Sequence, residues 1–206
     1  MSTDLRVRTP VEAPAPARIR PVWHRLCLTS VAVALAAGIG LHAVGSVDPV
    51  NQMLSDTVSS ATGALLLGVA CAALVVAAGC LAAAARTLLV RLSLLVWAAG
   101  LVALAVFPTN LPGTEVTTGA VVHRYGAALA VAVPPIVGLV VARGRRLRAV
   151  SLVAGGAAVL YGAAHAPAML TGAEVMPYAG LAERVLLGLI LGVVVLTSAE
   201  LRDRSR

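Results

Sequence analysis

The sequence contains no lysine and little charge of any kind. Charged residues make up 12% of the chain, whereas soluble domains usually carry about 25%. Hydrophobic residues make up 59%, and the mean hydropathy is +0.93. In water, a fold of 206 residues needs more polar surface than this composition supplies. We therefore expect lipid as the solvent.

The basic residues are 16 arginines, and the formal net charge is +7. They stand between apolar segments, not along one polar face with interleaved aromatic residues. A nucleic-acid-binding surface has the second pattern. No nucleic acid is therefore expected as a partner.

Catalytic and metal-binding motifs are scarce. Cys27, Cys71 and Cys80 all lie in apolar segments and form no CxxC pair, which argues against a disulfide framework and a zinc site. The sequence has no HExxH, no GxSxG and no phosphate-binding glycine loop. No motif thus indicates a cofactor or a metal.

Six long apolar stretches fill most of the chain. They span about 25–45, 57–84, 88–107, 118–141, 149–170 and 178–199. A helix needs about 20 residues to cross a hydrocarbon core ~30 Å thick, whereas strands of a membrane barrel are about 10 residues long. We therefore predict an all-α, polytopic membrane bundle of six transmembrane helices over 24–201. The first stretch is longer than the h-region of a signal peptide, which favours a retained anchor.

Two tails flank the predicted bundle. Residues 1–23 are rich in proline, alanine and arginine and have nothing to bury, which predicts a disordered cytoplasmic tail. Residues 202–206 form a short basic tail, also predicted to be cytoplasmic.

Arginine distinguishes the two sides of the predicted bundle. Apart from Arg124 and Arg184, every arginine lies in or close to the N-terminal tail, the second and fourth connections or the C-terminus. The positive-inside rule then places both termini in the cytoplasm and the protein in the cell membrane. The lipid bilayer is the expected partner, with anionic lipid as a further possible one at the cytoplasmic face.

Small residues and prolines bear on helix packing. Gly188 and Gly192 form a GxxxG motif, which favours close helix approach either within the chain or between two copies. The oligomeric state stays open. Pro134 and Pro135 predict a bend in the fourth helix.

Polar residues gather at the predicted outer ends of the helices. Charged groups in a membrane are costly and usually have a function. We therefore predict a polar, water-accessible pocket on the extracytoplasmic side, which binds a lipid headgroup or a small ligand. The candidate ligand-binding residues are Asp48, Asn51, Ser55, Asp56, Asn110, His123, His165, Glu183 and Arg184.

Each candidate has a simpler alternative role. Neighbouring helical residues point about 100° apart, so one of Glu183 and Arg184 is expected to face the bundle and the other not. Arg184 has the alternative role of a lipid-phosphate anchor. Asp56 is also a potential N-cap of the second helix, and His165 a potential cap of the backbone before Pro167.

Several short motifs resemble those of the DUF998 family, whose function is unknown. They are Asp48-Pro49-Val50-Asn51, Leu54-Ser55-Asp56, Phe107-Pro108-Thr109-Asn110, His123 and Gly180-Leu181-Ala182-Glu183-Arg184. The similarity covers about residues 25–200. It implies a six-helix membrane protein but no reaction. That family often has Asp where this chain has Asn110.

Three functional classes follow for the outer residues. The first is a binding or accessory protein. The second is a membrane-embedded enzyme acting on a lipid-linked substrate, with Glu183 or His123 as acid or base and Arg184 holding a phosphate. The third is a small-solute transporter, which usually needs a midplane site. A metal site made by Asp56, His123 and His165 is a further alternative.

The arginine pattern predicts the orientation of one connection directly. Reporter fusions in the 143–148 turn should be active only as cytoplasmic reporters, because its arginines resist translocation. Periplasmic alkaline phosphatase activity at this position would contradict the assigned sidedness.

Overall fold

The computed structural model describes residues 21–44, 47–109, 116–171 and 176–203, all helical apart from short connections. Its elements are α1 (Pro21–Val44), the 3-10 helix η1 (Leu54–Ser59), α2 (Ala61–Ala84), α3 (Leu88–Val106), α4 (Thr118–Val141), α5 (Arg145–Thr171) and α6 (Ala179–Asp203). Over the described ranges, six helices are long and apolar enough to cross a membrane. This confirms the predicted all-α bundle of six membrane spans.

The two predicted tails lie mostly outside the described residues. Helix α1 begins at Pro21 and α6 continues to Asp203. Residues 21–23 and 202–203, assigned above to the tails, thus belong to helices. The predictions for 1–20 and 204–206 fall outside the described residues.

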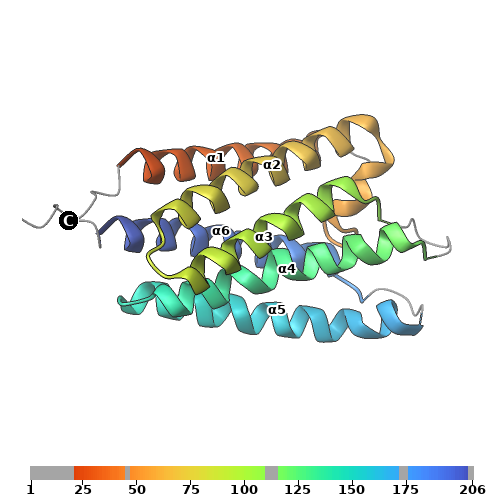
Figure 1. Ribbon diagram of the computed structural model, residues 1–206. Coiled ribbons are helices and arrows are strands. Elements are labelled where there is room, and N and C mark those ends of the chain that lie inside the picture. Colours follow the sequence, from red (N-terminus) through yellow and green to blue (C-terminus); the bar gives the residue numbers. More distant parts are fainter. Residues whose placement is uncertain (1–20, 45–46, 110–115, 172–175, 204–206) are drawn as a thin grey trace, which may run out of the picture.

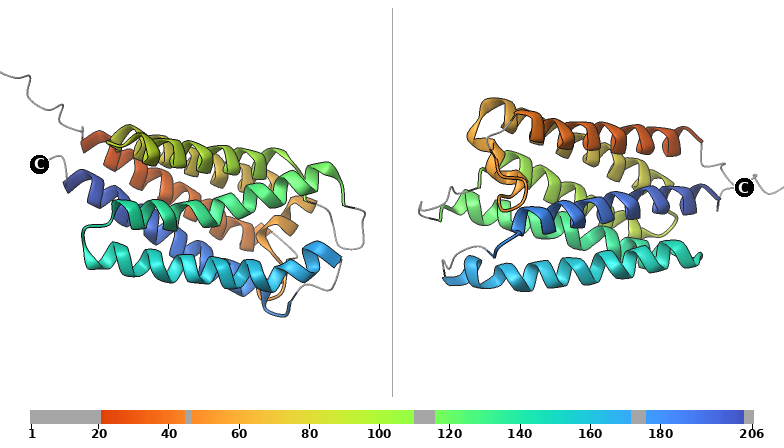
Figure 2. Two further views of the ribbon diagram at one scale, coloured as in Figure 1. Left: turned by 60° about the horizontal axis from the view of Figure 1, so that its bottom comes forward. Right: turned by 180° about the vertical axis from the view of Figure 1, so that it is seen from behind.

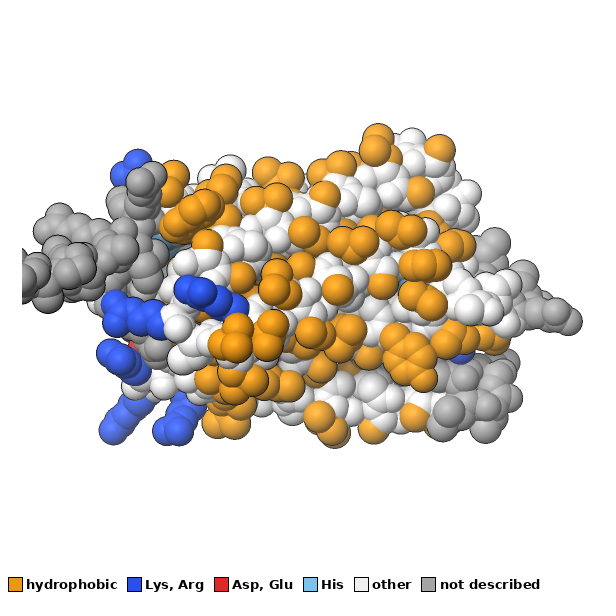
Figure 3. All heavy atoms as spheres, in the orientation of Figure 1, with side chains coloured by type: hydrophobic (Ala, Val, Ile, Leu, Met, Phe, Trp, Pro, Cys, Tyr) orange, Lys and Arg blue, Asp and Glu red, His pale blue; other side chains and the backbone are white. Residues whose placement is uncertain are grey.

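The six long helices lie side by side in one bundle (Figure 1). The start of α1, the end of α6 and the α2–α3 and α4–α5 turns share one end, and η1 lies at the other. Basic side chains gather at the first end, while the side of the bundle is largely apolar (Figure 3). Leu160 on α5 is 72% exposed and Leu88 on α3 is 69% exposed. Such a wide apolar surface is unusual on a soluble protein and fits contact with lipid.

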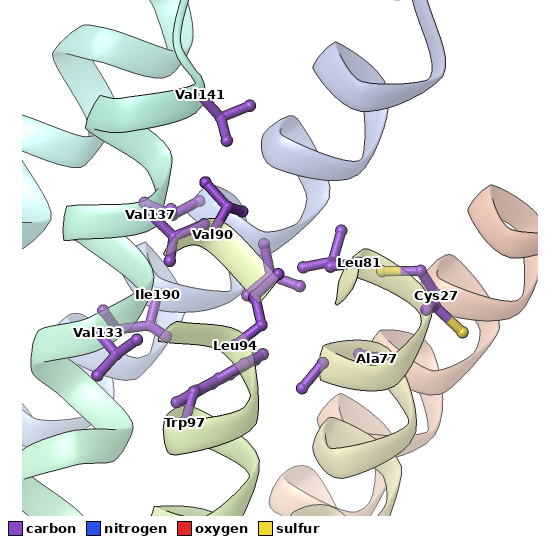
Figure 4. Close-up of a cluster of buried hydrophobic side chains, with 14 of the residues drawn as sticks. Cys27, Ala77, Leu81, Val90, Leu94, Trp97, Val133, Val137, Val141 and Ile190 are labelled. Carbon is purple, nitrogen blue, oxygen red and sulfur yellow. The ribbon is translucent and has the colours of Figure 1, made fainter. Parts of the chain in front are cut away.

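The core is built by large apolar side chains and close helix approaches. Trp97, Leu94 and Ile190 belong to one buried cluster that joins α3 to α4 and α6 (Figure 4). Helices α3 and α4 approach closely at two glycines, because a Cβ on Gly126 would lie 2.7 Å from the carbonyl oxygen of Gly100. Small residues allow such approach in lipid.

The GxxxG motif of α6 contributes little to packing within the chain. Among the described residues, nothing lies within 4 Å of a Cβ built on Gly188, and Val150 is 4.0 Å from one on Gly192. The motif therefore leaves Gly188 on an open face of the monomer.

A proline in α4 leaves one backbone carbonyl without its usual hydrogen bond, and a side chain of another helix replaces that bond. Both Pro134 and Pro135 lie inside α4, which continues to Val141. Since Pro134 has no N–H, the Ala130 carbonyl loses its usual partner four residues along. The indole Nε1–H of Trp97 on α3 donates to this oxygen at 3.1 Å. In a membrane core no water is available to do so. The bend predicted at this site stays a prediction.

Replacing Trp97 by Phe should lower the free energy of unfolding by about 1–2 kcal/mol, because the Ala130 carbonyl is left without a donor. SDS titration followed by far-UV circular dichroism measures this loss. The matched background is Pro134→Ala, whose new N–H can reach Ala130. The same Trp97→Phe change should cost clearly less there, and equal costs in both backgrounds would contradict the explanation.

Candidate functional site

The connection between α1 and α2 folds back over the end of the bundle that lies opposite the α2–α3 and α4–α5 turns. Helix α2 begins at Ala61 rather than near 57, because residues 54–59 form η1. Its N-cap is Ser60, whose Oγ accepts from the Gly63 N–H at 3.0 Å. The alternative role of Asp56 as the N-cap of the second helix is therefore wrong. A Cβ at Gly63 would overlap the Thr57 carbonyl, so this glycine lets η1 fold against α2. We call residues 48–60 the η1 segment.

The first turn of the η1 segment is organised by Asp48. One carboxylate oxygen of Asp48 accepts from the Val50 N–H at 2.8 Å, and the other accepts from Asn51 Nδ2 at 2.6 Å. These bonds, that of Asn51 first, lower the pKa of the exposed Asp48 carboxyl below its usual value. Gln52 Oε1 accepts from the Asp48 N–H at 2.7 Å. Asp48 thus holds a turn and does not reach into the bundle.

Asn51 connects this turn to the residue before α6. Its Oδ1 accepts from the Tyr178 N–H at 3.2 Å. Tyr178 has a backbone φ of 64°, a left-handed conformation that residues other than glycine seldom adopt. The hydrogen bond that Asn51 accepts therefore stabilises a costly backbone geometry just before α6 begins.

The N-terminal turn of α6 binds the η1 segment along its length (Figure 2). Leu181 N–H donates to the Val50 carbonyl at 3.0 Å. Glu183 Oε2 accepts from the Leu54 N–H at 2.7 Å. Arg184 Nη1 donates to the carbonyls of Gln52 at 2.9 Å and of Gly180 at 2.8 Å.

Glu183 and Arg184 therefore bind the same segment, which corrects the expectation that only one of them faces it. The physical reason is reach: Arg184 folds back by one helical turn to its own Gly180 carbonyl. Gly180 also permits the contact, because a Cβ there would overlap the Gln52 carbonyl. Arg184 Nε also lies 3.4 Å from His42 Nε2 on α1, at the limit of a hydrogen bond.

Asp56 caps η1 and not α2. Its Oδ2 accepts from the Met53 N–H at 2.9 Å. Burial raises the pKa of this half-buried carboxyl above its usual value, against smaller opposing effects of the Met53 bond, Arg184 and His123. Arg184 and His123 thus lie within electrostatic range of Asp56.

His123 on α4 points inward, while its neighbour Arg124 is half-buried. The His123 side chain is 4% exposed, and its Nδ1 lies 2.8 Å from the Phe107 carbonyl at the end of α3. A carbonyl only accepts, so Nδ1 carries the proton. His123 thereby connects α4 to the end of α3.

Helix α5 contributes Tyr161 and His165. The His165 ring is 6% exposed, and its centroid lies 4.1 Å from that of Tyr161. Its Nδ1 lies 2.9 Å from the Tyr161 carbonyl, so Nδ1 carries the proton and Nε2 of the neutral ring is an acceptor. His165 does not cap a break before Pro167, because α5 continues to Thr171.

Two buried atoms of this pair have no partner among the described residues. They are the hydroxyl oxygen of Tyr161 and Nε2 of His165. Tyr161 lies within electrostatic range of Glu183, Asp56 and Arg184. Tyr161 therefore connects His165 to the cluster around the η1 segment.

The structure thus joins most, but not all, of the predicted residues. Asp48, Asn51, Asp56, Glu183 and Arg184 hold the η1 segment directly, and His123 lies within electrostatic range of Asp56. Ser55 is half-buried in η1. Asn110 lies outside the described residues.

Sequence reasoning left out several residues of this site. Gln52 accepts from Arg184 through its backbone carbonyl, which every residue has. Gly63 and Gly180 each leave room for a neighbouring carbonyl, and the sequence does not indicate which of its glycines do so. Tyr161 shares a helix face with His165 at a spacing of four residues, so the sequence indicates that the two lie together but not that Tyr161 belongs to the site.

Around the η1 segment, the described residues form neither a metal-binding group nor either of the two small hollows of the bundle. Within the described ranges, no three His, Cys, Asp or Glu residues lie close enough to hold a metal ion. Asp56, His123 and His165 therefore do not form a set of three ligands there. Two small hollows lie elsewhere, one between α1, α2 and α6 at the arginine-bearing end and one in the core beside Trp97. The predicted pocket stays a prediction.

A family model described as a protein of unknown function, DUF998, matches residues 27–200. The chain belongs to the DUF998 family. No curated protein and no solved structure matches it. In this DUF998 protein, the motifs at 48–51, 54–56 and 180–184 contact one another in the outer cluster.

The contact at Gly180 yields a matched pair of variants on α6. Gly180→Ala should lower the free energy of unfolding by about 1–3 kcal/mol, the usual cost of overpacking, because the new Cβ overlaps Gln52. Gly188→Ala faces open space and should be neutral or slightly stabilising. Unfolding in SDS compares them, and hydrogen exchange at the Leu54 amide should accelerate only in Gly180→Ala. Equal protection of Leu54 in both variants would refute the role of Gly180.

Proposed function

We propose that this DUF998 protein is a multi-pass protein of the cell membrane with both termini in the cytoplasm. We propose further that it binds a lipid headgroup or a small polar ligand at its extracytoplasmic end. The arginine distribution supports the orientation. The arrangement around the η1 segment supports the binding function.

The observation that carries the proposal is a pair of buried atoms, Tyr161 Oη and His165 Nε2, to which the described residues offer no hydrogen-bond partner. A buried polar group without a hydrogen bond costs about 1–3 kcal/mol. Native proteins keep few such groups without a reason. A ligand that donates hydrogen bonds to these atoms would offset the cost, and the protein without ligand bears it.

The neighbouring groups favour a ligand rich in hydrogen-bond donors. Glu183 and Asp56 supply carboxylates, and one oxygen of each is bonded to a backbone N–H. His165 Nε2 is an acceptor, and Tyr161 Oη can accept or donate. A protonated amine or a group of hydroxyls matches this set. Arg184 already donates to two carbonyls, which makes it a support for the η1 segment.

The depth of the site also suits a headgroup. Glu183 lies four residues inside α6, about 6 Å along a helix that rises 1.5 Å per residue. This is close to the boundary between hydrocarbon and headgroups. A lipid headgroup could therefore reach the site without leaving the bilayer, and a soluble ligand could reach it from outside.

Ligand retention tests the proposal without disturbing the η1 segment. The protein is purified in native membrane particles, and retained lipids and small molecules are identified by mass spectrometry. A compound bearing an amine or hydroxyls should copurify with the natural protein. Tyr161→Phe removes only a hydroxyl that bonds to no described residue, so it should leave the fold intact and reduce retention by about tenfold, the effect of ~1.4 kcal/mol.

The matched control is Tyr125→Phe, because the Tyr125 side chain is 70% exposed. It should retain the compound at the natural level. Asp56→Asn should reduce retention as Tyr161→Phe does, since it removes the charge that a cationic donor meets. Equal retention by all four proteins, or no compound with the natural protein, would sink the proposed binding site.

A further inference from the structure

The turn between α4 and α5 carries a dense group of positive charges. Arg143, Arg145, Arg146 and Arg148 lie within one short segment, and all four side chains are exposed. Figure 3 shows basic side chains gathered at this end of the bundle. Helix α5 begins at Arg145 and has no acidic residue in its first turn. The positive end of the helix dipole therefore adds to the charge of the turn.

The guanidinium groups of this turn have no counter-ion among the described residues, with which they make neither an ion pair nor a hydrogen bond. Glu200 on α6 reaches the turn, but its Oε1 accepts from the backbone N–H of Arg143 at 3.1 Å. Elsewhere at this end, Arg91 donates to the Ala85 carbonyl at 2.9 Å, and Arg202 is in an ion pair. The α4–α5 turn therefore has positive charge that an anion from outside the chain can meet.

An apolar surface continues from two of these arginines along α5. At 100° per residue, Arg145, Arg148, Leu152, Gly156 and Val159 lie within about 80° of one another around the helix. All five are exposed, Leu152 by 58% and Val159 by 71%. Among the described residues, nothing lies within 4 Å of a Cβ built on Gly156. We call these five residues the α5 stripe.

The α5 stripe has the length of one membrane leaflet. From Arg148 to Val159 the helix rises ~16 Å, at 1.5 Å per residue. One leaflet contributes about half of a hydrocarbon core ~30 Å thick. Helix α5 has the smallest buried share of the six membrane spans and packs chiefly on α4 and α6. A lipid of that leaflet can therefore lie along the stripe with its headgroup beside the arginines.

We propose that the α5 stripe binds one anionic phospholipid, with the phosphate at Arg145 and Arg148 and one acyl chain along the three apolar residues. Helical residues three apart have Cβ atoms ~5–6 Å apart, so both guanidinium groups can reach one phosphate. Two positive charges favour a headgroup of net negative charge over a zwitterionic one. An acidic protein segment would match the arginines but would gain nothing from the apolar residues. The proposal is independent of the ligand proposed for the outer cluster.

Native mass spectrometry tests the proposal, because it counts the lipids that stay bound when the intact protein is released from detergent. Phosphatidylglycerol should bind about thirtyfold more tightly than phosphatidylcholine with the same acyl chains. This ratio corresponds to the ~1 kcal/mol that each of two basic residues contributes. The double variant Arg145→Gln/Arg148→Gln should lose most of the preference. Both side chains are exposed, so its far-UV circular dichroism should match that of the natural protein.

The matched control is the double variant Arg143→Gln/Arg146→Gln. It removes the same charge from the same turn, but Arg143 precedes α5 and Arg146 points about 100° away from Arg145. This variant should keep most of the preference. Glycerophosphoglycerol, the headgroup without acyl chains, should not displace the lipid even in hundredfold excess, because it cannot contact Leu152 and Val159.

Three results would overturn the proposal. Equal affinity for the two lipids would show that the α5 stripe does not select a negative headgroup. Equal losses in the two double variants would show a diffuse attraction to the whole basic turn and no defined site. Displacement by glycerophosphoglycerol would show that the acyl chain contributes nothing. None of these results bears on ligand retention at Tyr161, so the two proposals fail separately.

Discussion

Backbone hydrogen bonding in a solvent without water is the constraint on which this structure depends. The backbone N–H and C=O groups in the interior of a helix bond to one another. The groups that lack a partner are therefore at helix ends, at prolines and in connections. At two of these positions a side chain from another helix supplies the missing partner. Trp97 donates to the carbonyl that Pro134 leaves, and Glu183 accepts the first N–H of η1. Long-range polar bonds thus serve the backbone first.

The same constraint explains what could be predicted from the sequence. The six helices follow from apolar length alone, since no other structure spans lipid over about 20 residues. The start of α2 could not be predicted this way. It depends on Gly63 lying against the Thr57 carbonyl, which turns residues 54–59 into a separate 3-10 helix. Hydropathy does not distinguish such a turn from the first turn of a long helix.

For the outer cluster, the sequence predicted the participants better than their roles. Glu183, Arg184 and Asp56 were singled out because charge in a membrane is costly. Each proves to bind a backbone N–H or carbonyl of the η1 segment. A backbone amide is present at every non-proline residue, so no letter in the sequence indicates which one a carboxylate will meet. For Tyr161 and His165 the sequence indicates that the two side chains share a helix face. Only the structure shows that Tyr161 Oη and His165 Nε2 are buried with no partner among the described residues.

The bond between Leu54 and Glu183 joins residues 129 positions apart. During synthesis the η1 segment leaves the ribosome long before α6, and it meets its acceptor only after five helices have entered the membrane. The contacts between the η1 segment and α6 therefore form only after α6 has been made. A chain cut short before α6 would expose the Leu54 amide and the Gln52 carbonyl, which a membrane quality-control protease could recognise as an unfinished product.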